Sequence, residues 1–171
     1  MGLYGTGSST TRVDDKVDQL FVTRATPSFF TTLGAQPLHG RLPTDEDNDM
    51  VVVVSHWMWK TWFGSDPKLV GRSYFFAGAM RSVIGIMPPQ FRFDDAQAWF
   101  PFPFDLTGGQ RAGRAFPIVA RISSGSTVEQ VNAGLARLAR QNEQDFLSTN
   151  QEYAGRSIYV QPVAEFYFGP V

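Results

Sequence analysis

The residues best able to do chemistry are the neighbours Ser55 and His56, because serine and histidine supply the nucleophile and the base of many hydrolases. A nucleophilic serine on a sharp strand-to-helix turn needs flanking glycines, but Val53, Val54 and Trp57 surround this pair. Ser55 also stands between an apolar run and a helical pattern, where a helix takes an oxygen cap. We therefore predict that Ser55 caps a helix, and an enzyme that uses Ser55 or the acidic residues 45–49 is the weakest of our hypotheses.

Metal-binding patterns are also incomplete. His39 and His56 are the only histidines, so no pair of histidines occurs at helical spacing. Residues 45–49 form a dense acidic cluster that is similar to the start of a calcium loop, with oxygen side chains at alternate positions. However, Met50 stands where such a loop needs glycine, and His56 stands where it needs glutamate. We predict a solvated loop there and no metal site.

The glycine-rich residues 108–114 come nearest to a phosphate-binding loop. An arginine and an alanine stand where lysine and a hydroxyl residue are needed, and the segment precedes a predicted strand instead of following one. The neighbouring carboxylates Asp14-Asp15 and Asp94-Asp95 fall in predicted turns, which favours solvated loops over acid–base chemistry. We therefore expect no catalytic residue and no nucleotide or other cofactor.

Aromatic residues are better candidates for a functional role. On a helical wheel, Trp57 falls outside the apolar stripe of its own segment, and exposed tryptophans are frequent contacts at protein interfaces. The alternative is that another part of the chain covers it. In residues 96–105, aromatic residues alternate with small residues and prolines, and the prolines predict an edge strand or an extended segment. These aromatic residues either cover a neighbouring hairpin or bind a partner. The candidate partner surface consists of Trp57, Trp99, Phe100, Phe102 and Phe104.

Length and composition exclude several classes of protein. The 171 residues suffice for one domain or two small lobes. The net charge of -1 gives no electrostatic basis for binding nucleic acid or an anionic membrane. The absence of cysteine excludes disulfides and thiolate metal sites. No apolar run approaches the roughly 20 residues that cross a bilayer.

Residues 51–93 contain the clearest structural signals. A run of four valines fits a buried strand, and the helix after Ser55 should end at Gly64. Two β-type runs, residues 72–76 and 81–87, predict a hairpin joined at residues 77–79.

Upstream, residues 1–16 are typical of a flexible leader and residues 17–26 of a strand. That strand puts Leu20 and Val22 on one face and Phe21 on the other, and a helix runs from Thr26-Pro27 to Gly34.

The pattern changes in the last third of the chain. Residues 115–122 predict a strand, and Ser126 with Glu129 predicts a capping box at the start of a helix that reaches residue 147. Residues 156–163 predict a second strand, which completes a βαβ unit. The predicted fold class is α+β with two lobes. Residues 17–107 form a smaller lobe of short helices with a β-hairpin, residues 108–114 a linker, and residues 115–171 the βαβ lobe.

Three consecutive blocks carry a family resemblance. They read TPSFFTTLGAQPLHGR in residues 26–41, VVVVSHWMWKTWFGSDPKLVGR in residues 51–72, and VIGIMPPQFRF in residues 83–93. In order and spacing they resemble the MacB-like periplasmic core domain of ABC transporter permeases of the MacB/FtsX type. The similarity continues weakly to about residue 165.

This resemblance implies a function without chemistry in the domain itself. In the family the domain lies on the extracytoplasmic (periplasmic) face of the cytoplasmic membrane, between two membrane helices of the permease. It combines a porter-like βαβ lobe with a smaller, sabre-like inserted lobe. Partners would be a cytoplasmic ATPase domain or subunit and a periplasmic accessory protein or substrate, such as a lipoprotein, a peptide or an antibiotic.

One departure from the family is visible. The family has a further strand and helix near the start of the region, and neither is found before residue 17. We therefore expect a fragment with an incomplete porter lobe. The alternative hypothesis is a free-standing periplasmic binding or adaptor protein.

Overall fold

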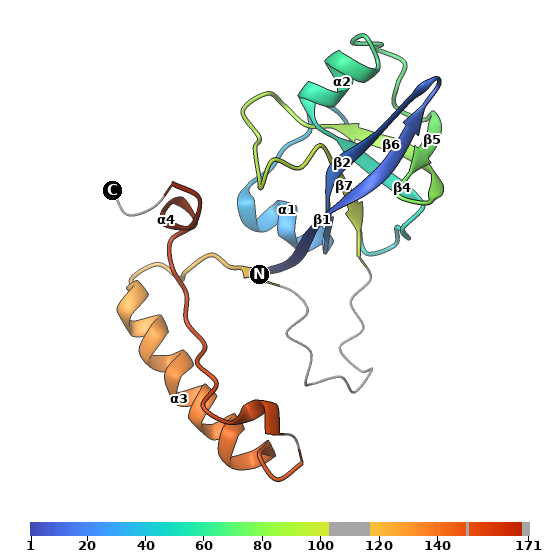
Figure 1. Ribbon diagram of the computed structural model, residues 1–171. Helices are drawn as coiled ribbons and strands as arrows, with labels where there is room; N and C mark the ends of the chain where they lie inside the picture. The colour runs from blue at the N-terminus through green and yellow to red at the C-terminus, as the bar shows by residue number, and fades with distance from the viewer. Residues whose placement is uncertain (103–116, 150, 169–171) are drawn as a thin grey trace. The chain divides into compact units, whose positions relative to one another are not determined.

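The computed structural model describes residues 1–102, 117–149 and 151–168 (Figure 1). These residues form a mixed α+β fold, as predicted, and they divide into two compact units. Residues 1–102 and 117–120 belong to the first unit, and residues 121–149 and 151–168 to the second. The predicted linker, residues 108–114, lies outside the described residues.

The first unit is built around a closed barrel of six strands. The strands of the chain are β1 (Gly2–Val13), β2 (Lys16–Ala25), β3 (His39–Gly40), β4 (Val51–Val54), β5 (Ser73–Phe76), β6 (Ala79–Ile86), β7 (Ala98–Pro101) and β8 (Ile118–Val119). The barrel order is β1, β2, β7, β4, β6, β5, and it closes because β5 pairs with β1. The β2–β7 and β4–β6 pairs are parallel, whereas the other barrel pairs are antiparallel. The short strands β3 and β8 pair with β6 and β1.

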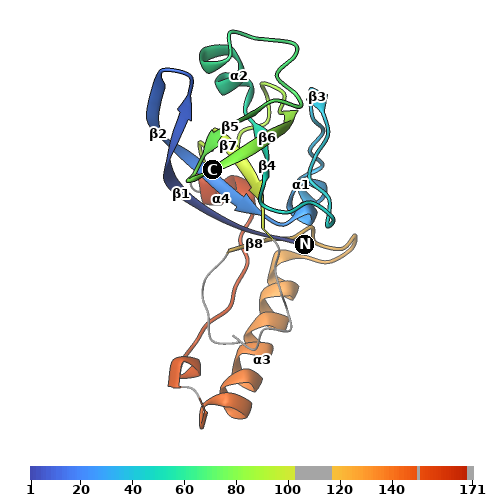
Figure 2. The ribbon, with the colours of Figure 1, turned by 90° about the vertical axis from the view of Figure 1, so that its right-hand side faces the viewer.

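Two seven-residue helices accompany the barrel, α1 (Pro27–Leu33) and α2 (His56–Trp62). Their ends follow the predicted signals. Thr26 occupies the N-cap position before Pro27, and Gly34 ends α1 in the left-handed conformation at φ 69°. Ser55 caps α2, since its Oγ accepts a hydrogen bond from the Met58 N–H at 3.1 Å. Figures 1 and 2 show α2 near the turn that joins β1 to β2, and the Lys16 Nζ donates to the Thr61 carbonyl there.

The hydrophobic core fills the inside of the barrel. Alternate residues of a strand point to opposite faces, so Val52 and Val54 join this core while Val53 points outward. Leu20 and Val22 are buried here and Phe21 is exposed, as predicted. The buried members of the core are Val13, Leu20, Val22, Val52, Val54, Met58, Leu69, Phe76, Val83, Ile86, Ala98 and Phe100.

A second apolar layer, the aromatic layer, packs outside the barrel. It joins α1, the start of β1 and the segment after β6 through ring contacts with centroids 4.8 to 6.5 Å apart. The short helix α1 contributes two fully buried phenylalanines to it, which explains how seven residues stay helical. The aromatic layer consists of Tyr4, Phe29, Phe30, Phe91, Phe93 and Trp99.

Two predictions for the first unit are wrong. Residues 1–16 do not form a flexible leader, because most of them belong to β1, which pairs with β2 from Tyr4↔Ala25 to Val13↔Lys16. Residues 98–101 do not form an edge strand. β7 lies inside the sheet between β2 and β4, and Pro101 is its last residue, so no ladder bond is lost within the strand.

The hairpin of β5 and β6 forms as predicted, and a glycine of β6 lies in close contact with β3 and the residue after it. Gly85 in β6 pairs with Gly40 in β3. A Cβ placed on Gly85 would lie 2.3 Å from the Arg41 carbonyl oxygen, far inside contact distance. Only glycine therefore allows β3 to approach β6 in this way.

The second unit is organised by α3 (Val128–Phe146). Its N-terminus has the predicted kind of cap, one residue later than expected. Thr127 accepts from the Gln130 N–H at 3.3 Å, and the Gln130 side chain accepts from the Thr127 N–H at 3.0 Å. The predicted residues Ser126 and Glu129 are therefore not the capping pair.

The predicted second strand, residues 156–163, does not form. This segment follows the short 3₁₀ turn Gln151–Tyr153 and leads into α4 (Val163–Phe168). It lies beside α3, where the Asn132 amide donates to the Val160 carbonyl at 3.0 Å and accepts from the Val160 N–H at 2.7 Å. The Asn132 side chain thus makes the two backbone hydrogen bonds that a neighbouring strand would otherwise make with Val160. Among the described residues β8 is the only remnant of the strand expected at 115–122, so the βαβ unit is absent there.

We predict that Gly85→Ala lowers the free energy of unfolding of the first unit by about 1–3 kcal/mol, because the new Cβ forces β3 away from β6. Urea denaturation measures the change. Gly7→Ala is the matched control, since a Cβ at Gly7 in β1 would meet no atom within 4 Å. Equal losses in the two variants would contradict the close approach.

We predict that Asn132→Ala speeds hydrogen exchange of the Val160 amide by about tenfold, because the hydrogen bond that protects its N–H disappears together with the bond to the Val160 carbonyl. Exchange followed by NMR spectroscopy tests this. Asn142→Ala in the same helix is the control, and unchanged protection of Val160 in the Asn132 variant would refute the contact.

Candidate functional site

Trp57 is the exposed member of an aromatic helix. Its neighbours on α2 turn inward: Met58 is fully buried, and the Trp59 Nε1 donates to the Asp66 carbonyl at 2.9 Å. Trp57 itself keeps 51% of its surface accessible. The position outside the apolar stripe, predicted from the helical wheel, is therefore correct.

A groove runs beside Trp57, between α2 and residues 88–97. It has a volume of about 630 Å³ and is open to solvent. On the α2 side its wall includes Trp57, Lys60 and Thr61, and on the other side it includes Arg92 and Asp95. The remaining residues that line it are Ser55, His56, Pro88, Pro89, Phe91, Phe93, Ala96 and Gln97.

The wall formed by residues 88–97 is fixed to the rest of the first unit by ring contacts and hydrogen bonds. Phe93 packs edge-on against Phe29 with centroids 4.8 Å apart, and Phe91 contacts Trp99 at 5.4 Å. Gln97 is tied to β2, because its backbone N–H donates to the Phe21 carbonyl and its Oε1 accepts from the Phe21 N–H. The groove is thus formed by rigid parts of the barrel and the aromatic layer.

A tight turn lies between Phe93 and Gln97. Asp94 and Asp95 both have positive φ, at 52° and 49°, and both are exposed. This agrees with the solvated turn that the sequence predicts for the pair. The turn puts the Asp95 carboxylate on the groove and leaves it there as the single carboxylate of the lining.

The groove brings together few side chains with acid–base chemistry. Its lining includes one carboxylate, Asp95, and one histidine, His56. The Ser55 Oγ is engaged in capping α2. Within residues 1–102, 117–149 and 151–168, no cluster of three or more His, Asp or Glu side chains could hold a metal ion.

The aromatic strip of β7 is not a surface. Trp99 is fully buried in the aromatic layer, and Phe100 is 1% exposed inside the barrel, where the Arg81 guanidinium lies 4.7 Å from its ring centroid. Both are therefore removed from the candidate partner surface. Phe102 is half-buried, and Phe104 lies outside the described residues. Alternation within a strand buried on both faces explains the error.

The acidic cluster at residues 45–49 binds the protein's own cations. Asp47 accepts from Arg41 at 2.6 and 2.7 Å and from the Thr44 N–H at 2.8 Å. These bonds, that from Arg41 above all, hold the pKa of the Asp47 carboxyl well below its usual range. Asp49 pairs with the buried Arg81 at 3.2 Å. The cluster is thus a loop fastened by salt bridges.

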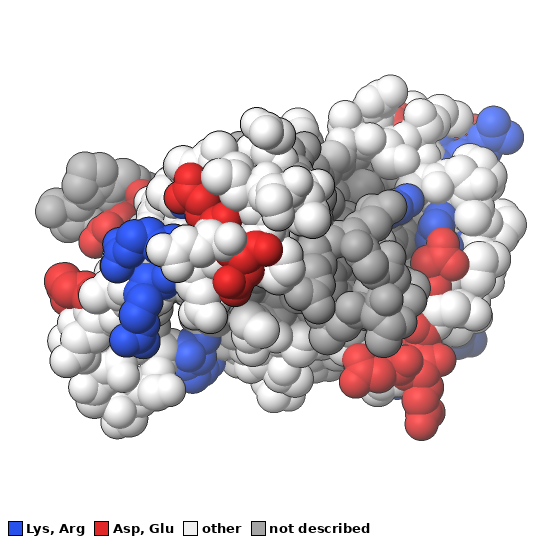
Figure 3. All heavy atoms as spheres, turned by 90° about the horizontal axis from the view of Figure 1, so that it is seen from below, with Lys and Arg blue, Asp and Glu red and all other residues white. Residues whose placement is uncertain are grey.

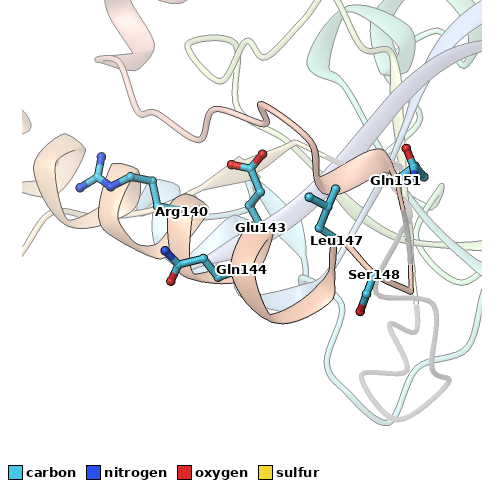
Figure 4. A pocket seen from close by; sticks show the side chains of 6 residues that line it. All are labelled: Arg140, Glu143, Gln144, Leu147, Ser148 and Gln151. Atoms are coloured by element: carbon cyan, nitrogen blue, oxygen red, sulfur yellow. The ribbon is translucent and has the colours of Figure 1, made fainter.

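A second hollow, in the second unit, lies along the end of α3 and has a volume of about 590 Å³. Figure 4 shows that its polar side chains point in different directions instead of converging on one position. It therefore offers no site of comparable definition. The residues that line it are Arg140, Glu143, Gln144, Leu147, Ser148 and Gln151.

Comparison with known families shows to which protein family the chain belongs. The family model described as "MacB-like periplasmic core domain" matches residues 3–138, well over half of the chain. The chain belongs to this family. The resemblance seen in three sequence blocks is therefore confirmed, and the protein is a MacB-like periplasmic core domain of the kind found in ABC transporter permeases. No curated protein matches the sequence.

Solved structures agree on the fold. The periplasmic region of MacB from Actinobacillus actinomycetemcomitans matches with a TM-score of 0.62 and 18% identity, over 84% of this chain and 66% of that one. The extracellular domain of the noncanonic ABC-type transporter YknZ from Gram-positive bacteria gives 0.58 and 14%, over 85% and 75%. A domain of a putative permease from Porphyromonas gingivalis gives 0.61 and 13%, over 100% and 83%. The chain thus spans just under two thirds of the length of the MacB periplasmic region.

No helix among the described residues is long and apolar enough to span a membrane. On the face drawn in Figure 3, acidic and basic side chains both occur, and some of them lie side by side. Neither sign dominates that face, in keeping with the net charge of -1.

We predict that Asp47→Asn lowers the free energy of unfolding by about 1 kcal/mol at neutral pH. Because the folded-state pKa of Asp47 is depressed, the stabilisation is fully present above the unfolded value of about 3.9 and is lost as pH falls through the folded value. The difference between wild type and variant should therefore shrink in acid. Urea denaturation at a series of pH values measures it.

Asp45→Asn is the matched control, because Asp45 is exposed and forms no salt bridge with a described residue. A difference that persists unchanged at the lowest pH, or one equal to that of Asp45→Asn, would contradict the role given to the Arg41–Asp47 pair.

Proposed function

We propose that this domain is the non-catalytic, extracytoplasmic part of an ABC transporter permease. It would lie at the periplasmic face of the cytoplasmic membrane and pass ATP-driven movement of the permease to the export or extraction of a substrate such as a lipoprotein, a peptide or an antibiotic. The observation that carries the proposal is the family match over residues 3–138. ATP would be hydrolysed by a cytoplasmic domain or subunit, linked to this domain through the membrane helices of the full-length permease.

The absence of a catalytic constellation in the described residues supports a mechanical role. The groove beside Trp57 contains one carboxylate, and two carboxylates of the acidic loop, Asp47 and Asp49, are paired with Arg41 and Arg81. A relay needs surfaces that contact other molecules, and it needs no chemistry of its own. The exposed Trp57, backed by the rigid wall of residues 88–97, is such a surface.

The division of the chain into two compact units also suits a relay. Separate units can change their arrangement by hinge motion while each keeps its own packing. The barrel, with its filled interior and its aromatic layer, would act as one rigid body in such a movement.

We predict that Trp57→Ala in the full-length permease lowers transport about tenfold or more and leaves basal ATP hydrolysis by the partner ATPase unchanged, because the substitution removes a contact and no catalytic group. Resistance of producing cells to a panel of antibiotics, peptide antibiotics among them, measures transport, and phosphate release from membranes measures hydrolysis. Phe102→Ala, which alters the one described and accessible member of the β7 strip, should have a weaker effect in the same direction.

Met80→Ala is the matched control, because Met80 in β6 is 53% exposed and does not line the groove. If ATP hydrolysis falls together with transport in the Trp57 variant, the residue acts on the ATPase cycle and the contact role is wrong. If Met80→Ala is as damaging as Trp57→Ala, the effect is not specific to this surface.

A further inference from the structure

The groove between α2 and residues 88–97 carries unbalanced charge. Lys60 and Arg92 are exposed, one on each wall, and neither forms a salt bridge with a described residue. Asp95 is the one carboxylate among the lining residues, and His56 is the remaining titratable group. At neutral pH two fixed cations therefore face one anion, so the groove attracts acidic groups.

Apolar side chains line the same groove. Trp57 is 51% exposed, Pro88 and Pro89 follow the end of β6, and Phe91 is partly accessible. Tryptophan with rigid proline and phenylalanine neighbours gives contact area at little cost in side-chain entropy. The groove thus combines apolar contact area with one cation on each of its two walls.

We propose that this groove binds an extended acidic segment of a partner protein, in which carboxylates flank an apolar or aromatic side chain. The apolar side chain packs against Trp57 and Phe91, and the carboxylates pair with Lys60 and Arg92, the latter through its two-pronged guanidinium. This inference rests on the contact role proposed above for Trp57 and specifies the chemistry of the partner.

Other kinds of ligand fit the groove less well. A small molecule is usually enclosed by its site, whereas this groove is partly open to solvent. An anionic membrane surface attracts clusters of several lysines and arginines, whereas only two such residues, Lys60 and Arg92, line this groove. An extended peptide can contact both walls of an open groove with a few side chains.

The test uses a fluorescein-labelled peptide in which glutamates and aspartates flank one phenylalanine, with fluorescence anisotropy as the readout on the full chain. We expect saturable binding that weakens as salt is added. Lys60→Gln and Arg92→Gln should each raise Kd about threefold, and Trp57→Ala about tenfold or more. Unfolding curves of each variant verify that it is folded.

Two controls make the test specific. Lys68→Gln alters an exposed lysine of the same unit that does not line the groove, and it should leave Kd unchanged. A peptide with lysines in place of its acidic residues should not bind. The inference is overturned if the acidic peptide fails to bind or if Lys68→Gln weakens binding as much as Lys60→Gln. It is also overturned if vesicles of anionic phospholipid bind the wild type more tightly than the Lys60, Arg92 and Trp57 variants, because the groove would then recognise a membrane surface.

Failure here is distinguishable from failure of the proposed function. If the peptide does not bind while Trp57→Ala still abolishes transport in the full-length permease, the contact role stands and the acidic partner is wrong. If the peptide binds as expected while Trp57→Ala leaves transport intact, the groove is a binding site and its role in transport is wrong.

Discussion

The insertion of β7 between β2 and β4 is the constraint on which the first unit depends. Its four residues, Ala98–Pro101, pair with β2 on one side and with β4 on the other, and all four are buried. Ala98 and Phe100 point into the barrel, whereas Trp99 points into the aromatic layer. One short backbone ladder therefore fixes both apolar layers, and a register slip by one residue would exchange their side chains.

The position of β7 also determines the shape of the groove. Gln97 directly precedes β7, and its carbonyl accepts from the Ser55 N–H, which places the start of α2 beside the end of the segment 88–97. Trp99 supports Phe91 from behind. The outward position of Trp57 is thus set by the strand ladder beneath α2, and a contact surface at this place needs no movement of the barrel to form.

Local signals made much of the first unit predictable. The Thr26-Pro27 start of α1, the Ser55 cap of α2 and the hairpin of β5 and β6 each depend on a few adjacent residues, and all three form. β1 was missed because its glycines, serines and threonines have the composition of a flexible segment, and its stability comes from pairing with β2. In residues 156–163 the apolar alternation was real, but the Asn132 side chain took the backbone bonds that a strand partner would have made.

The candidate site was predictable only in part. The helical period alone was enough to predict an exposed Trp57. Arg92 and Asp95 reach the groove through tertiary packing of Phe91 and Phe93, which no local pattern contains. The β7 aromatics were misassigned as surface because an aromatic strand buried on both faces and an exposed aromatic strip have the same composition.

The position of β7 also determines when the barrel can fold. Its parallel partner β2 ends at Ala25, and its antiparallel partner β4 ends at Val54, so both partner strands are synthesised before β7. Until then each keeps an open edge, and the aromatic layer lacks Trp99. Non-local pairings of this kind close late and slowly, since the intervening loop must first be ordered. The newly made chain therefore passes through a stage in which the edges of β2 and β4 are open to other strands, and its tendency to aggregate is greatest in that interval.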